Sequence, residues 1–151
     1  MDTGTAQMKI DYSKIVKKEF DFIRSINSRW RDMDVIGHIN NETLLSYFED
    51  VRVKYFSSLG FNINSSNVSK SVILAGMKID YLLQANYPDN YEVGCRIIRV
   101  GNKSFDLLSV IFKEGSDRPV VGGVFSIVCF DYIEQKTILV PNNVRGYLNP
   151  L

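Results

Sequence analysis

The residues best suited to chemistry lie in one short segment, residues 31–41, which reads RDMDVIGHINN. The segment holds two carboxylates, Asp32 and Asp34, together with His38, which is the chain's only histidine. A carboxylate can attack a carbonyl carbon or activate a water molecule for the same attack. The segment leads into a predicted helix, whose first amides lack partners and carry the positive end of the dipole. Because such a helix end stabilises an oxyanion, with one donor contributing about 3–4 kcal/mol to a transition state, the pattern indicates acyl transfer.

Two other uses of these residues fit the sequence less well. One histidine with two aspartates could hold a cation, but no second histidine or cysteine lies in reach, so no metal site is predicted. A Ser-His-Asp triad lacks its usual nucleophile motif, because no G-x-S-x-G string occurs in the chain. The carboxylates therefore remain the favoured reactive groups.

A long helix over residues 41–59 must position this segment. Its apolar residues recur at helical spacing and form one stripe. They are Leu44, Leu45, Phe48, Val51, Tyr55, Phe56 and Leu59. Asn40 or Asn41 can cap the start of the helix, and Gly60 can end it. The carboxylate segment is thus predicted to be a loop held against a capped helix end.

Two charged residues occupy unusual places on this helix. Arg52 falls inside the apolar stripe and Glu49 falls at its edge. Because they are three residues apart, they can form an ion pair on one face. The plain interpretation is a structural pair that holds the helix against a sheet.

The rest of the chain predicts an antiparallel sheet. A first strand is expected over residues 19–28, and alternating or continuously apolar runs predict later strands. These runs are residues 71–83, 91–100, 104–113 and 120–130, and Pro141 is expected to end regular structure. The fold class is therefore α+β. One helix can cover one face of the sheet, so the other face or an edge needs a partner, and at least a dimer is predicted.

Length and charge limit the remaining possibilities. The 151 residues suit one domain, with residues 1–17 as a loosely held leader that includes a helical turn near 12–18, and residues 18–151 as the folded domain. A net charge of +1 gives no field that would recruit nucleic acid or an anionic membrane. No signal peptide or membrane-spanning run is recognised, so a cytoplasmic location is expected. Cys95 and Cys129 are predicted to be buried thiols.

The chemistry-bearing segment also resembles a known signature. The string DMDVIGHINN at 32–41, followed by YFEDVR at 47–52, is similar to hotdog-fold acyl-CoA thioesterases. The resemblance is strongest to the 4-hydroxybenzoyl-CoA thioesterase-like group. It continues through residues 79–81, the turn at 101–104 and the Val-Pro pair at 140–141. The resemblance implies a hotdog fold, in which a mainly antiparallel sheet of five to six strands wraps one long helix.

The resemblance also implies roles for individual residues. Asp34 matches the catalytic aspartate, which acts as nucleophile or general base. The backbone N–H of Asn41 matches the donor to the thioester oxygen, and Gly37 and His38 belong to the same motif. His38 matches a catalytic histidine of plastid acyl-carrier-protein thioesterases, but Ile36 stands where those enzymes have asparagine.

Substrate contacts are assigned to a second set of residues. They are Glu49, Tyr81, Lys103 and Ser104. Glu49 could orient the attacking water, while Lys103, with Lys70 and Arg145, could bind the phosphates of coenzyme A. The expected partners are an acyl-CoA substrate and further copies of the chain, as a homodimer or homotetramer. No metal or redox cofactor is implied, since water is the second substrate.

Two other functions stay open from the sequence. An enoyl-thioester hydratase on the same fold would also use an aspartate and a histidine, here Asp34 and His38. A non-catalytic acyl-CoA-binding module would use the same pocket without turnover. Release of free thiol from an acyl-CoA separates hydrolysis from both.

Overall fold

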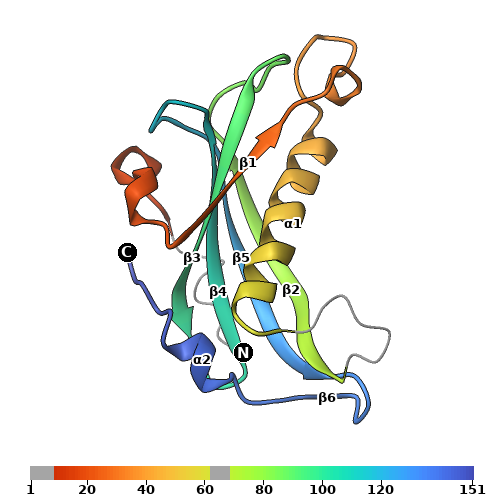
Figure 1. Ribbon diagram of the computed structural model, residues 1–151, viewed down its shortest axis with the longest axis vertical. Coiled ribbons are helices and arrows are strands. Elements are labelled where there is room, and N and C mark those ends of the chain that lie inside the picture. The colour runs from red at the N-terminus through yellow and green to blue at the C-terminus, as the bar shows by residue number, and fades with distance from the viewer. Residues whose placement is uncertain (1–8, 62–68) are drawn as a thin grey trace.

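A computed structural model describes residues 9–61 and 69–151 and shows one long helix held in the curve of an antiparallel sheet (Figure 1). The six-stranded sheet has the order β1-β3-β4-β5-β2, with β6 paired to β5. Its strands are β1 (Phe22–Asn27), β2 (Lys70–Tyr81), β3 (Asn90–Val100), β4 (Ser104–Lys113), β5 (Pro119–Asp131) and β6 (Lys136–Thr137). The helices are α1 (Asn41–Ser58) and α2 (Asn142–Arg145), with short 3-10 turns η2 (Tyr12–Lys14), η3 (Lys17–Glu19) and η4 (Trp30–Asp32). This arrangement confirms the predicted hotdog fold.

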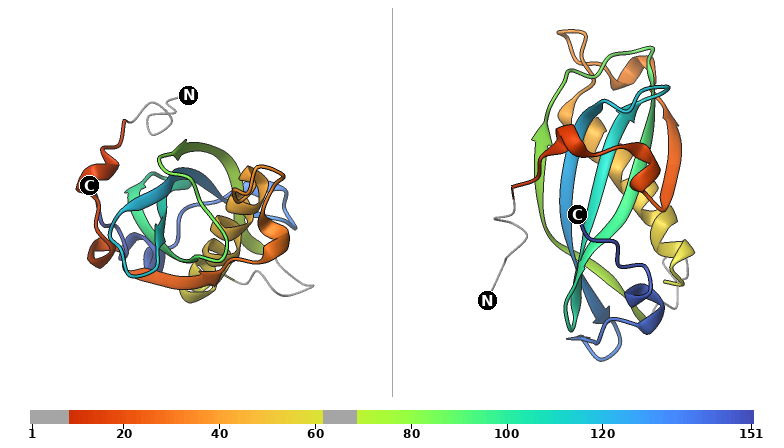
Figure 2. Two further views of the ribbon diagram at one scale, coloured as in Figure 1. Left: turned by 90° about the horizontal axis from the view of Figure 1, so that it is seen from above. Right: turned by 90° about the vertical axis from the view of Figure 1, so that its left-hand side faces the viewer.

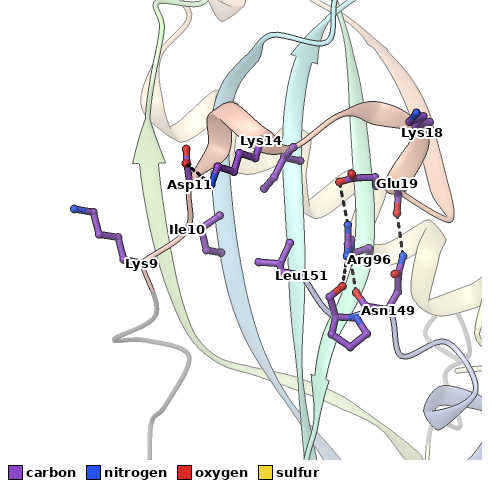
Figure 3. Close-up of a pocket in the computed structure, with 11 residues that line it drawn as sticks. Lys9, Ile10, Asp11, Lys14, Lys18, Glu19, Arg96, Asn149 and Leu151 are labelled. Atoms are coloured by element: carbon purple, nitrogen blue, oxygen red, sulfur yellow. Dashed lines mark hydrogen bonds and ion pairs between the residues drawn. The ribbon is translucent and has the colours of Figure 1, made fainter.

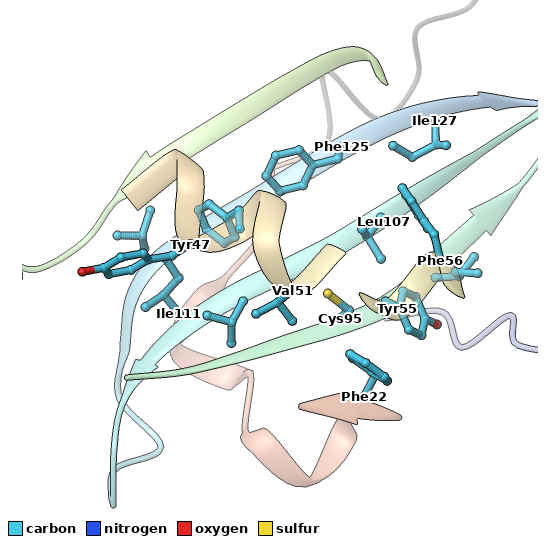
Figure 4. Close-up of a cluster of buried hydrophobic side chains, with 14 of the residues drawn as sticks. Phe22, Tyr47, Val51, Tyr55, Phe56, Cys95, Leu107, Ile111, Phe125 and Ile127 are labelled. Atoms are coloured by element: carbon cyan, nitrogen blue, oxygen red, sulfur yellow. The ribbon is translucent and has the colours of Figure 1, made fainter. Parts of the chain in front are cut away.

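The apolar stripe of α1 packs against the inner face of the sheet. Phe48 and Val51 are fully buried, and the Phe48 ring lies 5.2 Å from the ring of Phe125 on β5. Val51 of α1 and Phe125 belong to the same cluster of buried side chains (Figure 4). Cys95 and Cys129 are buried free thiols, as their strand positions predict. Helix and sheet therefore share one core, which fixes the helix axis relative to the strands.

Two element boundaries differ from the sequence prediction. The first strand is shorter than expected, because residues up to Glu19 form 3-10 turns before β1 begins at Phe22. Pro141 does not end regular structure. Its φ of −61° suits the start of a helix, and it is the N-cap of α2.

The N-terminal segment is held more firmly than the predicted leader. Residues 1–8 lie outside the described part, but Tyr12, Ile15 and Phe20 are buried on the outer face of the sheet, opposite α1 (Figure 2). A Cβ built on Gly122 would lie 2.0 Å from the Tyr12 ring, and one on Gly94 would lie 2.7 Å from the Phe20 ring. The strands thus leave room for these rings. The chain covers much of its own outer face, so that face does not need a second copy.

The strand β2 forms a long edge of the sheet that has no strand paired to its outer side among the described residues. Within residues 9–61 and 69–151, β2 pairs only with β5, and its other side has no strand partner. Leu74, Met77 and Tyr81 are 41%, 52% and 49% exposed along it. An unpaired strand with exposed apolar side chains is a template for pairing with another chain. The fold therefore leaves one strong candidate interface.

Candidate active site

Asp34 lies in a tight turn that its own carboxylate holds together. Its Oδ1 accepts hydrogen bonds from the amides of Ile36 (2.9 Å) and His38 (3.2 Å). Its carbonyl accepts from the Gly37 amide (3.1 Å), and its amide donates to the His38 carbonyl (2.7 Å). Gly37 has a φ of +88°, which glycine adopts without strain. Oδ2 of Asp34 has no hydrogen-bond partner within the described residues, so one carboxylate oxygen remains available.

The turn is tied to the first residues of α1. The Asn40 side chain caps the helix by accepting from the Glu42 amide (2.9 Å). The Asn40 amide donates to the carbonyl of Asp32 (3.0 Å), on the other side of the turn. The amide of Asn41 finds no acceptor in the part of the chain that the structure describes. A positive helix end with a free N–H therefore lies beside the carboxylate turn.

Asp32 anchors the loop to the helix from inside. Its carboxylate is 3% exposed and accepts from the Tyr47 hydroxyl (2.6 Å) and from the amide (2.9 Å) and guanidinium (3.2 Å) of Arg29. Burial alone would raise the pKa of Asp32, but the hydrogen bonds from Tyr47 and Arg29 lower it below its usual value. Burial and the bond to the Asp32 carboxylate raise the pKa of Tyr47. The Asp32 carboxylate therefore ties the loop to α1.

A second anchor joins the loop to the chain that follows β2. The Ile39 amide donates to the Ala85 carbonyl (2.8 Å), and both residues are buried. His38 forms an isolated bridge with Asn86. The His38 ring is partly exposed and makes no hydrogen bond to another described residue. The Asp34 turn therefore sits at the end of the sheet where β2 stops.

Glu49 lies on the same helix but farther from the turn. It follows Asn41 by eight residues, which is about 12 Å along the helix axis. Glu49 is 72% exposed at its side chain, and its carboxylate lies 3.8 Å from the guanidinium of buried Arg52. That guanidinium lies over the Phe125 ring, 4.7 Å from its centroid. The predicted ion pair is therefore present, and the aromatic contact shows how a cation fits within the apolar stripe.

The remaining predicted residues are divided between the two ends of the sheet. Tyr81 ends β2, near the segment that contacts the Asp34 turn. Lys103 and Ser104 lie at the β3–β4 turn, where the Gly101 amide donates to the Ser104 carbonyl (2.7 Å). This turn shares a pocket with Lys70, the first residue of β2. Within one chain, Lys103 and Ser104 therefore lie at the opposite end of the sheet from Asp34.

Three prominent surface pockets lie among the described residues, and none of them is lined by a residue of the Asp34 turn. The first, about 750 Å³, lies between the N-terminal segment and the C-terminal residues. At its base the Arg96 guanidinium donates to the Asn149 carbonyl (2.9 Å) and pairs with Glu19 (Figure 3). The second, about 730 Å³, holds Lys103, and the third, about 550 Å³, lies between β1 and α1 and includes Glu49. In a single chain, then, Asp34 faces none of these three pockets.

Sequence reasoning missed two residues that the structure places beside the predicted site residues. Tyr47 was part of the recognised string, but its buried bond to Asp32 depends on how the loop folds back on α1. Lys136 lines the same pocket as Lys103, yet nothing in its local sequence marks it. Its place follows only from the pairing of β6 with β5.

Two general properties complete the description. Among the described residues, no helix is both long and apolar enough to cross a membrane. In the same residues, no group of three or more His, Cys, Asp or Glu side chains could hold a metal ion.

A curled antiparallel sheet around one helix, with a carboxylate turn at the helix start, defines a hotdog-fold domain. The chain belongs to the thioesterase-like superfamily, whose family model matches residues 28–148. It is 33% identical over 91 residues to the uncharacterized protein YsmA of Bacillus subtilis (strain 168), and the match spans 60% of each chain.

Solved structures share this architecture. The PA5185 protein from Pseudomonas aeruginosa strain PAO1 has a TM-score of 0.78 at 25% identity, covering 88% of this chain and 92% of its own. A thioesterase from Thermus thermophilus, complexed with coenzyme A and Zn, has a TM-score of 0.72 at 23% identity. The match covers 87% of this chain and 93% of the Thermus chain.

Proposed function

We propose that this protein hydrolyses acyl-CoA thioesters, with Asp34 as the reactive carboxylate. The proposal rests on two groups near the start of α1 that have no hydrogen-bond partner among the described residues. Oδ2 of Asp34 is unbonded among the described residues, while Oδ1 is fixed by the amides of Ile36 and His38. The Asn41 amide beside it is an unpaired donor, within the same described residues, at the positive end of α1. A carbonyl between them would meet a nucleophile on one side and an oxyanion donor on the other.

The reaction needs only water and the residues of the site. In one form, Oδ2 of Asp34 attacks the thioester carbon, the C–S bond breaks, and the thiolate of coenzyme A takes a proton. Water then hydrolyses the resulting acyl-aspartyl anhydride. In the other form, Asp34 takes a proton from a water molecule that attacks directly. Both forms yield a free acid and a thiol, and both place negative charge on the oxygen that faces the Asn41 amide.

A second copy of the chain would complete the site. Val35 and Ile36, which follow Asp34 directly, are 104% and 75% exposed, and Leu82 follows the open β2 edge at 40%. Val35 and Ile36 are therefore apolar neighbours of Asp34 in the chain that remain open to solvent. A homodimer formed through β2 would cover them and create an apolar cleft for the acyl group. Light scattering at micromolar concentration should therefore report a dimer or a larger assembly, and a stable monomer would count against this part of the proposal.

The fold relation favours a substrate linked to coenzyme A. The Thermus structure of the same architecture holds coenzyme A. A panel of aliphatic and aromatic acyl-CoAs, assayed by release of free thiol, identifies the acyl group. Free thiol also separates hydrolysis from hydration or simple binding, which leave the thioester intact.

The decisive variant is Asp34→Asn, which keeps the size of the side chain and an oxygen for the loop amides. We expect kcat to fall about 10²–10⁴-fold, because the amide can neither attack nor accept a proton from water. The matched control is Asp50→Asn, which changes an exposed aspartate of α1 that pairs with Lys54. Circular dichroism should show both variants folded. Near-normal turnover by Asp34→Asn would refute the assignment.

A further inference from the structure

Arg52 carries hydrogen-bond donors that the folded chain does not use. Its guanidinium is buried in the apolar stripe of α1, 4.7 Å from the centroid of the Phe125 ring and 3.8 Å from the Glu49 carboxylate. The second distance is too long for a hydrogen bond. A guanidinium has five N–H donors, and within residues 9–61 and 69–151 none of those of Arg52 finds an acceptor. The side chain keeps 8% of its surface exposed, so an acceptor from outside the core can reach it.

Arg52 lacks an acceptor rather than a counter-ion. Burial lowers the pKa of its guanidinium, and the charge of Glu49 opposes that shift. The positive charge is therefore partly balanced, while the directional donors stay unfilled. A second carboxylate at this place would be repelled by Glu49. The group best suited to fill the donors is an uncharged oxygen, such as a hydroxyl.

Apolar side chains of β2 lie beside Arg52. Met77 is the register partner of Phe125, so both side chains are on the inner face of the sheet. Ile79 and Tyr81 follow at alternate positions on the same face. Met77 and Tyr81 are about half exposed, and Ile79 packs partly against the core. The inner face of β2 therefore forms an apolar path from the level of Arg52 to the end of the strand.

Two independent measures give the length of this path. Four residue steps from Met77 to Tyr81 span about 13 Å along β2. On α1, the eight steps from Asn41 to Glu49, whose carboxylate marks the level of the guanidinium, span about 12 Å. An extended chain covers about 1.2 Å per bond, since three bonds of a peptide span about 3.5 Å. An acyl chain that starts at the Asn41 amide therefore reaches Arg52 after about ten bonds.

We propose that Arg52 selects acyl groups that carry an uncharged oxygen at about the tenth carbon. The thioester carbonyl lies at Asp34, the methylene chain contacts the apolar path, and the guanidinium donates to the oxygen at the far end. This inference rests on the proposed thioesterase function and adds a substrate class to it. A hydrogen bond from a charged donor favours the oxygenated chain over a plain chain of equal length by about tenfold.

Matched pairs of acyl-CoAs test the chain end. Plain chains of about six to fourteen carbons, which bracket the expected reach, are compared with the same chains bearing a terminal hydroxyl. Release of free thiol gives kcat/KM for each. We expect the ratio of hydroxylated to plain chain to reach about tenfold near ten carbons. At both ends of the series it should fall below one, because the hydroxyl leaves water without meeting Arg52.

A third chain end separates hydrogen bonding from charge. An acyl-CoA of about ten carbons that ends in a carboxylate should be hydrolysed less well than the hydroxylated chain, because Glu49 repels it. Glu49→Gln removes this repulsion and should reverse the order, since a carboxylate accepts more strongly than a hydroxyl. A carboxylate chain that is already the better substrate of the wild type would overturn the inference, by showing that charge selects the chain end.

Variants at Arg52 test the assignment directly. Arg52→Met removes the donors and keeps an unbranched side chain that suits the apolar stripe, while Glu49 remains solvated. The tenfold preference should disappear, and turnover of the plain chain should be retained. Arg52→Lys keeps the charge without the planar fork and should lose most of the preference.

The matched control is Arg24→Met. The Arg24 guanidinium also lies over an aromatic ring, 3.9 Å from the centroid of Phe22, but it is exposed on β1 and donates to the Ile23 carbonyl (2.8 Å). This variant should leave the ratio unchanged. Circular dichroism checks the fold of each variant, and if Arg52→Met does not fold, the Arg52→Lys ratio and the wild-type length series decide.

The outcomes separate this inference from the proposed function. Equal kcat/KM for plain and hydroxylated chains at every length would overturn the selection by Arg52 and leave the hydrolase function intact. A preference that persists in Arg52→Met would also overturn it, by assigning the oxygen to another residue. A wild type that releases no thiol from any acyl-CoA would overturn the proposed function itself, and this inference with it.

Discussion

The buried bond between Tyr47 and Asp32 gives a direct test of how the Asp34 loop is held. The Tyr47 hydroxyl lies 2.6 Å from Oδ2 of Asp32, and the two residues are 5% and 3% exposed. In Tyr47→Phe the ring and its packing remain, while the carboxylate keeps its bonds to Arg29. The change therefore isolates one hydrogen bond to a buried charge.

The size of the effect follows from the burial of both partners. A hydrogen bond to a charged group contributes about 1.5–3 kcal/mol, and without the Tyr47 hydroxyl Oδ2 of Asp32 keeps only the Arg29 amide as a donor. We expect Tyr47→Phe to lower the free energy of unfolding by about 2 kcal/mol. For a chain of this length that corresponds to a fall in Tm of about 4–8 °C. Because the bond ties α1 to the loop that carries Asp34, kcat for acyl-CoA should also fall.

Urea denaturation at fixed protein concentration measures the change, since association would otherwise shift apparent stability. Tyr132→Phe is the matched control, because its hydroxyl donates to the Val72 carbonyl (2.9 Å) from an exposed position. It should cost no more than about 0.5 kcal/mol. A double-mutant cycle with Asp32→Asn isolates the pair energy. A coupling energy near zero, or equal losses for Tyr47→Phe and Tyr132→Phe, would show that this bond does not hold the loop.

Three further changes test other parts of the structure. Gly122→Ala should lower the free energy of unfolding by about 1–3 kcal/mol, because its Cβ would lie 2.0 Å from the Tyr12 ring. Tyr12→Ala in the same chain should recover part of this loss. If urea denaturation shows that the losses of the two variants simply add, the contact is refuted. Cys95 and Cys129 should react with a thiol reagent at pH 8 only as the protein unfolds, because burial raises their pKa values to about 12 and 11; rapid reaction of the native protein would contradict their burial. The lowered pKa of Asp32 contributes stability that is present above its unfolded pKa of about 3.9 and is lost as pH falls through its lower folded pKa. The stability difference between wild type and Asp32→Asn should therefore be constant near pH 7 and shrink below pH ~4, and an equal difference at pH 3 would refute this linkage.

The local elements could be predicted because their signals are local. The spacing of apolar residues along α1, the cap at Asn40 and the glycine at position 60 are read within one helical turn or two. The observed helix, Asn41–Ser58, begins at the predicted residue and ends one residue before the predicted end. The strands β2 to β5 follow for the same reason, since alternation and turn residues mark them. The place of Arg52 in the stripe was visible too, although its contact with Phe125 was not.

The N-terminal segment shows why a polar sequence misleads. Residues 9–19 contain several lysines and no periodic apolar pattern, so they suggest a loose leader. Tyr12 and Ile15 nevertheless reach an outer sheet face whose shape at Gly122 comes from β5, more than a hundred residues later. Contacts at that separation leave no trace in the local pattern.

The sequence by itself determined that a carboxylate-bearing turn precedes a capped helix, and it determined the family to which that string belongs. Those features depend on neighbours within about ten residues, where backbone geometry and side-chain spacing are sufficient. Only the tertiary structure decided that Lys70, Lys103 and Lys136 share one pocket, that Lys103 lies far from Asp34 in its own chain, and that β2 is an open edge. These facts follow from the order of strands in the sheet. That order is set by how the whole core packs, and no short stretch of residues encodes it.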